Sequence, residues 1–118
     1  MKTETKLIHF SEGIELESGE KLNSFDLMVE TYGELNEGKS NAILLCHAFS
    51  GNHHAAGSSE DFGIGWWDQL VGPSKTIDTN KYFVVCCNNL GGCAGSSGPS
   101  SIDPVSYTHL RAHETKWH

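Results

Sequence analysis

Positive charge is scarce in this sequence: its 118 residues include eight Lys and Arg against fifteen Asp and Glu, which gives a formal net charge of −7. A chain of this sign repels phosphate backbones and anionic membrane surfaces, so we expect neither nucleic acid nor a membrane as a partner. No apolar run is long enough to span a membrane, and apolar residues 7–10 are too few for the core of a signal peptide. We therefore expect a cytoplasmic protein.

Signs of a disulfide framework are also missing. The sequence has four cysteines, of which Cys86 and Cys87 are adjacent and Cys46 lies inside an apolar run. This arrangement favours reduced thiols in a core. No internal repeat is present, and 37% of the residues are apolar, too many for a disordered chain, so we expect one globular unit at most.

Two wholly apolar runs, residues 42–46 and 82–87, predict strands that are buried on both faces, as the central strands of a parallel sheet are. Between them, the apolar positions within residues 66–71 are spaced like one face of a short helix. Gly72 and Pro73 would end that helix.

Alternation of apolar and polar side chains marks two earlier segments, residues 13–17 and 25–32. With the turn-forming residues between them, they predict an antiparallel hairpin with one face in water. Hairpin, strand, helix and strand in this order are typical of the start of an α/β sheet.

A phosphate-loop pattern, G-x-x-x-x-G-K-[ST], is matched at every fixed position by residues 33–40. A phosphate loop must open a helix whose amide groups hold the phosphates, whereas Ser40 is followed almost at once by a predicted strand. Glu34 and Glu37 would also bring negative charge to the nucleotide. We interpret the segment as an ordinary turn between strands.

A loop rich in histidine, residues 47–57, directly follows the first apolar run, at the strand end where chemistry tends to lie in α/β sheets. One interpretation is a metal site built from His47, His53 and His54 with Asp61 or Glu60. Adjacent His53 and His54 cannot easily both face one ion, however, and we expect no metal.

Three other interpretations of this loop stay open on the residues alone. Ser50 could be a nucleophile, but it lacks the flanking glycines of a G-x-S-x-G turn. The backbone N–H groups could form an oxyanion hole for a developing negative charge. The segment could also be a plain surface loop.

A stretch dense in Gly and Ser, residues 88–101, follows the second apolar run. Its glycines do not supply the G-x-G-x-x-G of a dinucleotide site, and neither Ser96 nor Ser97 has the glycines of a nucleophile turn. Cys93 could be a nucleophile, but no base can be assigned to it. The composition predicts a tight loop that another backbone or a ligand can approach closely.

Taken together, these segments resemble the homoserine O-acetyltransferases in order and spacing, from about residue 10 to residue 104. The resemblance is carried by residues 30–36, 40–42, 46–57, 65–68, 72–73, 77–79, 83–86, 88–93, 95–96 and 98–101. It is less specific for the acyl donor than for the family.

The resemblance implies a chain of the α/β class with the α/β-hydrolase fold, of which the amino-terminal part is present: the hairpin and the first central strands of the sheet. In that fold the strand at 82–87 lies between the hairpin and the strand at 42–46. The implied activity is a step of methionine biosynthesis in which a serine takes the acetyl group from acetyl-CoA and the hydroxyl of L-homoserine then takes it from the serine. Acetyl-CoA is a co-substrate, no other cofactor is expected, and the full-length enzyme would be a homodimer.

Site residues carry over from the resemblance as well. The fold draws one oxyanion donor from the loop after its third strand, which places this role on the backbone N–H of Phe49. The family usually has Leu here, but a backbone atom is the donor. Asn52, His53, His54 and Ala55 are expected to line the same pocket and to bind substrate.

The sequence departs from the family after Pro104. Residues 105–118 have no family likeness and look like translated adapter sequence, so we assign residues 1–104 to the α/β-hydrolase domain and the tail to an artefact. The Ser-Asp-His triad is absent, so we expect the chain as given to be inactive, and its bare sheet edge predicts poor solubility. Alternatives are succinyl-CoA as donor, serine as acceptor, or a short non-catalytic binding protein.

Overall fold

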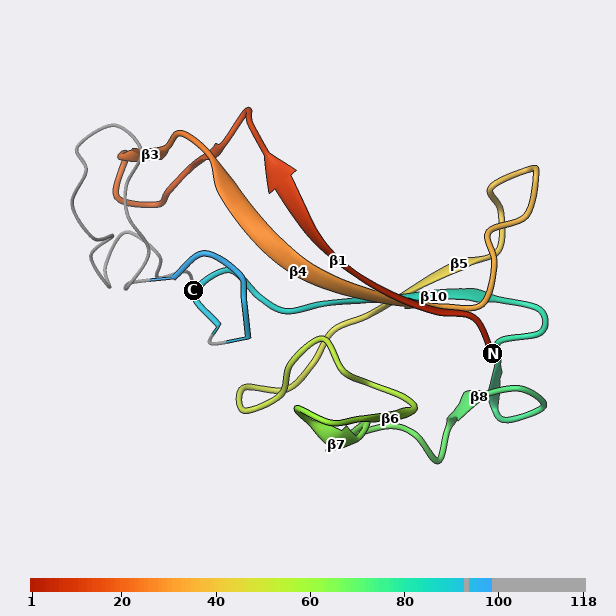
Figure 1. Ribbon diagram of the computed structural model, residues 1–118. Helices are drawn as coiled ribbons and strands as arrows, with labels where there is room; N and C mark the ends of the chain where they lie inside the picture. Colours follow the sequence, from red (N-terminus) through yellow and green to blue (C-terminus); the bar gives the residue numbers. More distant parts are fainter. Residues whose placement is uncertain (93, 99–118) are drawn as a thin grey trace. The chain divides into compact units, whose positions relative to one another are not determined.

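The computed structural model describes residues 1–92 and 94–98, and Figure 1 follows the chain through them. These residues form strands and no helix, so no described helix could span a membrane. The strands are β1 (Thr3–Phe10), β2 (Ile14–Glu15), β3 (Lys21–Leu22), β4 (Phe25–Tyr32), β5 (Ala42–Leu45), β6 (Ser58–Ser59), β7 (Gly63–Ile64), β8 (Val71–Gly72), β9 (Ile77–Asp78) and β10 (Phe83–Cys87). The tail assigned to residues 105–118 lies outside the described residues.

Two compact units make up the chain. The first contains Met1–Lys6 and Val29–Cys87, and the second contains Leu7–Met28 and the described residues from Asn88 onward. Each unit has a small apolar core of its own. The histidine-rich loop belongs to the first unit and the loop rich in Gly and Ser to the second.

The largest sheet has the strand order β1-β4-β10-β5. Strand β10 pairs in parallel with β5, where Val84 lies opposite Ile43, and antiparallel with β4, where Val84 lies opposite Tyr32. The predicted order, with the second apolar strand between the first one and the strand at 25–32, is therefore confirmed (Figure 1). Since β5 and β10 are parallel, the loop after β5 leaves the sheet at the carboxyl-terminal edge of both strands.

The predicted hairpin is wrong in its pairing. Strand β2 pairs with β3, where Ile14 lies opposite Leu22, and not with residues 25–32. The Leu16 N–H donates to the Glu20 carbonyl (2.8 Å) and the Gly19 N–H to the Leu16 carbonyl (2.9 Å), which closes a turn earlier in the chain than expected. Strand β4 is thereby left to lie between β10 and β1, and β1 is a strand that was not predicted.

Strand β4 is an interior strand, which corrects the expectation that one of its faces is in water. Val29, Glu30 and Tyr32 on this strand are all buried. Tyr32 packs with Val84 and Cys86 of β10 in the core of the first unit, and these three side chains are 0% exposed. The polar atoms of Glu30 and Tyr32 must therefore find partners inside the protein.

The predicted helix over residues 66–71 does not form; turns lead into β8 instead. The Leu70 N–H donates to the Trp67 carbonyl three residues back (2.9 Å), which is turn geometry. The Trp67 N–H donates to the carbonyl of Ala55 (2.7 Å), so the segment is attached to the histidine-rich loop. So short a segment does not form a helix unless packing supports it, and here the packing contacts fix turns.

Strand β5 is not buried on both faces as predicted. Leu45 is buried, but Ala42 is exposed and Leu44 is 65% exposed. An apolar strand of a parallel sheet is covered on both faces only where further elements pack on it. The apolar run thus predicted strand β5 and its pairing with β10, but not the exposure of the β5 side chains in this chain.

The described cysteines are free thiols, in agreement with the prediction. Cys86 is buried, and burial raises the pKa of its thiol to about 12. Cys46 is exposed, which corrects its assignment to the core. Cys93, the candidate nucleophile, lies outside the described residues.

The segment that matches the phosphate-loop pattern forms a turn, as interpreted. The Asn36 carbonyl accepts the Lys39 N–H (3.0 Å) and Asn36 Oδ1 accepts the Ser40 N–H (2.8 Å). Asn41 Nδ2 donates to the carbonyls of Glu34 (3.0 Å) and Lys81 (2.9 Å), which joins the turn to the residues before β10. Strand β5 follows directly, so the helix that a phosphate loop requires is replaced by a strand.

Candidate functional site

The histidine-rich loop begins at the carboxyl-terminal end of β5 with a tight turn. The Gly51 N–H donates to the Ala48 carbonyl (2.8 Å), which places Phe49 and Ser50 at the two central positions of the turn. The Phe49 side chain is fully exposed. None of the hydrogen bonds between described residues uses the Phe49 N–H, so this amide can donate to an oxygen of a bound molecule.

The hydroxyl of Tyr32 holds the far end of this loop. It accepts hydrogen bonds from the backbone N–H groups of Ala55 (2.8 Å) and Ala56 (3.2 Å), and it donates to Glu30 Oε1 (2.7 Å). Burial, and then the hydrogen bond to Glu30, raise the pKa of the Tyr32 hydroxyl well above its ordinary value. The hydroxyl therefore keeps its proton and can serve as both donor and acceptor.

His54 is bonded at both ring nitrogens. Its Nδ1 lies 2.8 Å from Glu30 Oε1 and its Nε2 lies 2.9 Å from the Gly63 carbonyl oxygen. The Gly63 carbonyl can only accept, so Nε2 donates to it, and a second hydrogen bond joins Nδ1 to Glu30 Oε1. Glu30 Oε2 also accepts the Thr5 hydroxyl (3.2 Å). The side chains of His54 and Glu30 are only 4% and 5% exposed, so the contact between them is buried.

His53 lies next to this pair but differs from it in chemistry. Its side chain is buried, its ring meets Phe62 edge-on at a centroid distance of 5.2 Å, and its Nδ1 has no hydrogen-bond partner among the described residues. Burial lowers the pKa of His53 below its ordinary value. The ring is therefore neutral at neutral pH, and it can accept or donate one more hydrogen bond.

Asn52 fixes the middle of the loop through its backbone and its side chain. Its carbonyl accepts Trp66 Nε1–H (3.0 Å) and faces the Cys86 thiol (3.6 Å), and its Oδ1 accepts the His54 N–H (2.8 Å). Ala55 is fully buried. Of the four residues predicted to bind substrate, His54 and Ala55 thus have side chains directed into the unit, and substrate contact at all four stays a prediction.

Gly65 lets a second segment lie directly on the loop. A Cβ atom at this position would collide with the backbone of Ala55 and Ala56. The Gly65 N–H donates to the Gly57 carbonyl (2.8 Å), and the following residues bond to the loop in the same way. The loop is therefore fixed from two sides, by Tyr32 and by the segment that starts at Gly65.

The three histidines do not form the metal site considered above. Within residues 1–92 and 94–98, no group of three or more His, Cys, Asp or Glu side chains is placed to hold a metal ion. Both nitrogens of His54 are already bonded to Glu30 and Gly63.

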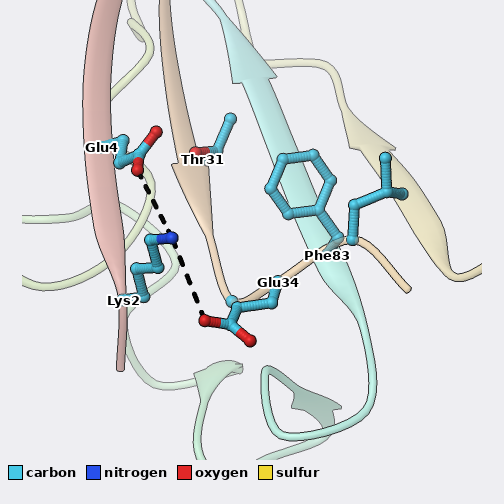
Figure 2. A pocket seen from close by; sticks show the side chains of 7 residues that line it. Lys2, Glu4, Thr31, Glu34 and Phe83 are labelled. Atoms are coloured by element: carbon cyan, nitrogen blue, oxygen red, sulfur yellow. Dashed lines mark ion pairs between the residues drawn. The ribbon is translucent and has the colours of Figure 1, made fainter. Parts of the chain in front are cut away.

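A small polar pocket of about 210 Å³ lies elsewhere in the first unit (Figure 2). Lys2 bridges two carboxylates there, Glu4 (3.6 Å) and Glu34 (3.9 Å), as the dashed lines in Figure 2 show. Phe83, at the start of β10, also lines it, so the pocket is at the end of the strand away from the loop that follows β5. Gly33, Glu34 and Leu35 of the phosphate-loop pattern line this pocket, but Lys39 and Ser40 are not among its lining residues.

The loop rich in Gly and Ser makes close backbone contacts, as its composition predicted. Ser96 Oγ accepts the Met28 N–H (2.9 Å) and donates to the Asn88 carbonyl (2.6 Å). The Ser97 N–H donates to the Asp26 carbonyl (2.8 Å). These serines act as partners for the first half of β4, and both hydroxyls are engaged within the unit. Pro99 and the residues after it lie outside the described residues.

Comparison with known proteins connects this fold and loop to one group of enzymes. No family model matches the sequence. The chain is 60% identical over 102 residues to a homoserine O-succinyltransferase of Alkalilimnicola ehrlichii and 62% identical over 101 residues to one of Hahella chejuensis. These matches cover 85% and 84% of the chain but 27% and 26% of the relatives. The chain therefore spans about a quarter of the length of the curated relatives it matches.

Solved structures define the fold class. A homoserine O-acetyltransferase from Bacillus anthracis superposes with a TM-score of 0.74 at 40% identity, covering 92% of this chain and 30% of that one. Esterase E22 superposes with a TM-score of 0.79 at 32% identity, covering 92% and 31%. The predicted fold is thus confirmed: the chain has the α/β-hydrolase fold in part. The sequence matches are named homoserine O-succinyltransferases, and the solved structures are a homoserine O-acetyltransferase and an esterase.

Proposed function

We propose that this sequence is the first part of a homoserine O-acyltransferase that works in two steps. A serine hydroxyl attacks the acyl carbonyl of an acyl-CoA, and CoA leaves as its thiol. The hydroxyl of L-homoserine then attacks the acyl-serine, so the O-acyl ester leaves and the serine is regenerated. The 118 residues contain no G-x-S-x-G, so the serine belongs to a part of the enzyme that this sequence does not include.

The turn at Phe49 is the observation that carries this proposal. Both steps pass through a tetrahedral intermediate whose oxygen is negative, and a fixed N–H aimed at that oxygen lowers both barriers. The Phe49 N–H stands at the carboxyl-terminal end of β5, has no partner among the described residues and lies in a loop fixed on both sides. Because the backbone is the donor, Phe can replace Leu here without loss of the function.

The acyl donor divides the proposal into two candidates. Relatives that are 58–62% identical are named homoserine O-succinyltransferases, which favours succinyl-CoA. Acetyl-CoA, the donor expected from the sequence motifs, is the second candidate, because the B. anthracis structure at 40% identity is named an acetyltransferase. The higher identity makes succinyl-CoA the better supported donor.

The test begins with the complete gene. The source DNA is read past the codon for Pro104, the complete protein is expressed, and CoA release is followed with L-homoserine and either succinyl-CoA or acetyl-CoA. We expect release that depends on homoserine, with a higher kcat/KM for succinyl-CoA. L-serine serves as the competing acceptor. A reading frame that ends at His118, or a complete protein that releases no CoA with either donor, would overturn the proposal in favour of a non-catalytic role.

A further inference from the structure

We infer that Glu30, Tyr32 and His54 are positioning residues: their buried hydrogen-bonded network holds the loop that presents the Phe49 amide. This inference rests on the proposed function, because it assigns the network to the geometry of the oxyanion donor. None of the three was predicted to do this from sequence. His54 was expected to bind substrate instead.

The buried network is costly to the sheet. Glu30 is a charged residue on an interior strand, in a place where an apolar side chain would pack without desolvation. Its pairing partner is a residue of the loop, His54, at 2.8 Å. The sheet itself gains little from this arrangement, whereas the loop gains a fixed attachment to β4.

The network holds several backbone atoms of the loop. The Tyr32 hydroxyl accepts two consecutive backbone N–H groups, those of Ala55 and Ala56. His54 adds a bond from its ring to the Gly63 carbonyl (2.9 Å), so the same network also holds the next hairpin, β6-β7. Backbone groups held in this way cannot shift without breaking several hydrogen bonds at once.

Phe49 lies between two fixed points of the chain. The loop leaves β5 after Leu45 and is fixed again from Asn52 to Ala56. The Phe49 N–H lies in the short span between them, in a turn closed by Gly51. An error of about 1 Å in the position of a catalytic group can lower a rate by about 100-fold. Loss of the anchor is thus expected to act on the transition state rather than on binding of homoserine.

Tyr32→Phe in the complete protein is the decisive variant, because it removes one oxygen and leaves the packed ring. We expect kcat per active site, counted from the acyl-enzyme burst, to fall on the order of 10- to 100-fold, with the KM for homoserine changed by less than about threefold. Glu30→Gln, which removes the charge and keeps the shape, is expected to lower kcat in the same direction. Counting active sites separates this effect from a mere loss of folded enzyme.

A matched control uses the same chemistry away from the loop. Tyr82→Phe removes a hydroxyl from a tyrosine that is 41% exposed. This variant is expected to keep kcat within about threefold of the unsubstituted enzyme.

Each outcome bears on one proposal only. If the unsubstituted enzyme transfers no acyl group, the proposed function fails. If it is active and both Tyr32→Phe and Glu30→Gln keep their kcat per site, the positioning role is wrong while the proposed function stands. Loss of folding in both variants, with Tyr82→Phe folded, would likewise overturn the inference by assigning the network to folding alone.

Discussion

Gly65→Ala should loosen the candidate loop without touching any residue that could take part in chemistry. The added methyl group would lie on the carbonyl group of Ala55 and the nitrogen of Ala56. These are backbone atoms, which cannot rotate away as the end of a side chain can. The segment that starts at Gly65 and the loop must therefore move apart.

The cost follows from the hydrogen bonds that join these two segments. The Gly65 N–H to Gly57 carbonyl bond (2.8 Å) and the Trp67 N–H to Ala55 carbonyl bond (2.7 Å) are at full strength, and a longer one joins Trp66 N–H to the His54 carbonyl (3.4 Å). Each hydrogen bond contributes a net of about 1 kcal/mol. Overpacking a core by one methyl group costs about 1–3 kcal/mol. Breaking these hydrogen bonds would relieve the overlap, so the two costs do not add in full. We expect the free energy of unfolding to fall by about 2–4 kcal/mol.

Urea unfolding of the complete protein measures this loss, and Gly38→Ala is the matched control. A methyl group at Gly38 would meet its nearest neighbour, Ser40 Oγ, at 3.7 Å, an ordinary contact. That variant should keep the unfolding midpoint or raise it slightly, because Ala restricts the unfolded chain. Gly65→Ala should lower the midpoint on the order of 1 M. Equal midpoints for the two variants would refute the close backbone approach at Gly65.

Three further perturbations test other parts of the first unit. An alkylating reagent at pH 8 should modify Cys46 well before Cys86, because Cys46 is exposed and the buried Cys86 thiol has a pKa of about 12. Peptide mass spectrometry of briefly treated native protein measures the order, and a reversed order would contradict the prediction. Burial lowers the pKa of His53, so the unfolded chain takes up this proton first and the protein loses stability as the pH falls from 7.5 to 5.5. His53→Phe should make that loss smaller. An unchanged difference between the urea midpoints at the two pH values would contradict this. Leu44→Ser should make the 118-residue chain more soluble, since this side chain is 65% exposed, but should lower the melting temperature of the complete protein if further elements cover β5 there.

The strands that form the middle of the sheet could be predicted because their signal is local. Apolar runs at 42–46 and 82–87 leave few alternatives to buried neighbouring strands, and the family resemblance supplied their order. The hairpin could not be placed, since the alternation in residues 25–32 fits any antiparallel partner. Only the turn at residues 16–20 excludes residues 13–17 as that partner. The short helix failed for a similar reason: the spacing of apolar residues in 66–71 is the same for a helix and for turns that pack on a loop.

Phe49 was singled out through the family resemblance and its role stays a prediction, whereas the network beneath it was not predicted. Burial of Glu30 depends on β1 and β10 lying on either side of β4, and the partner of its carboxylate is 24 residues away in the chain. One local signal was present: Glu30 and Tyr32 are two residues apart on a strand, so they share a face. A carboxyl group beside an aromatic hydroxyl on a strand that proves to be interior must be paired, and its partner proved to be a histidine of the loop after β5. The contact between Glu30 and His54 therefore joins the sheet to the loop, and its loss is expected to disturb the loop before the sheet.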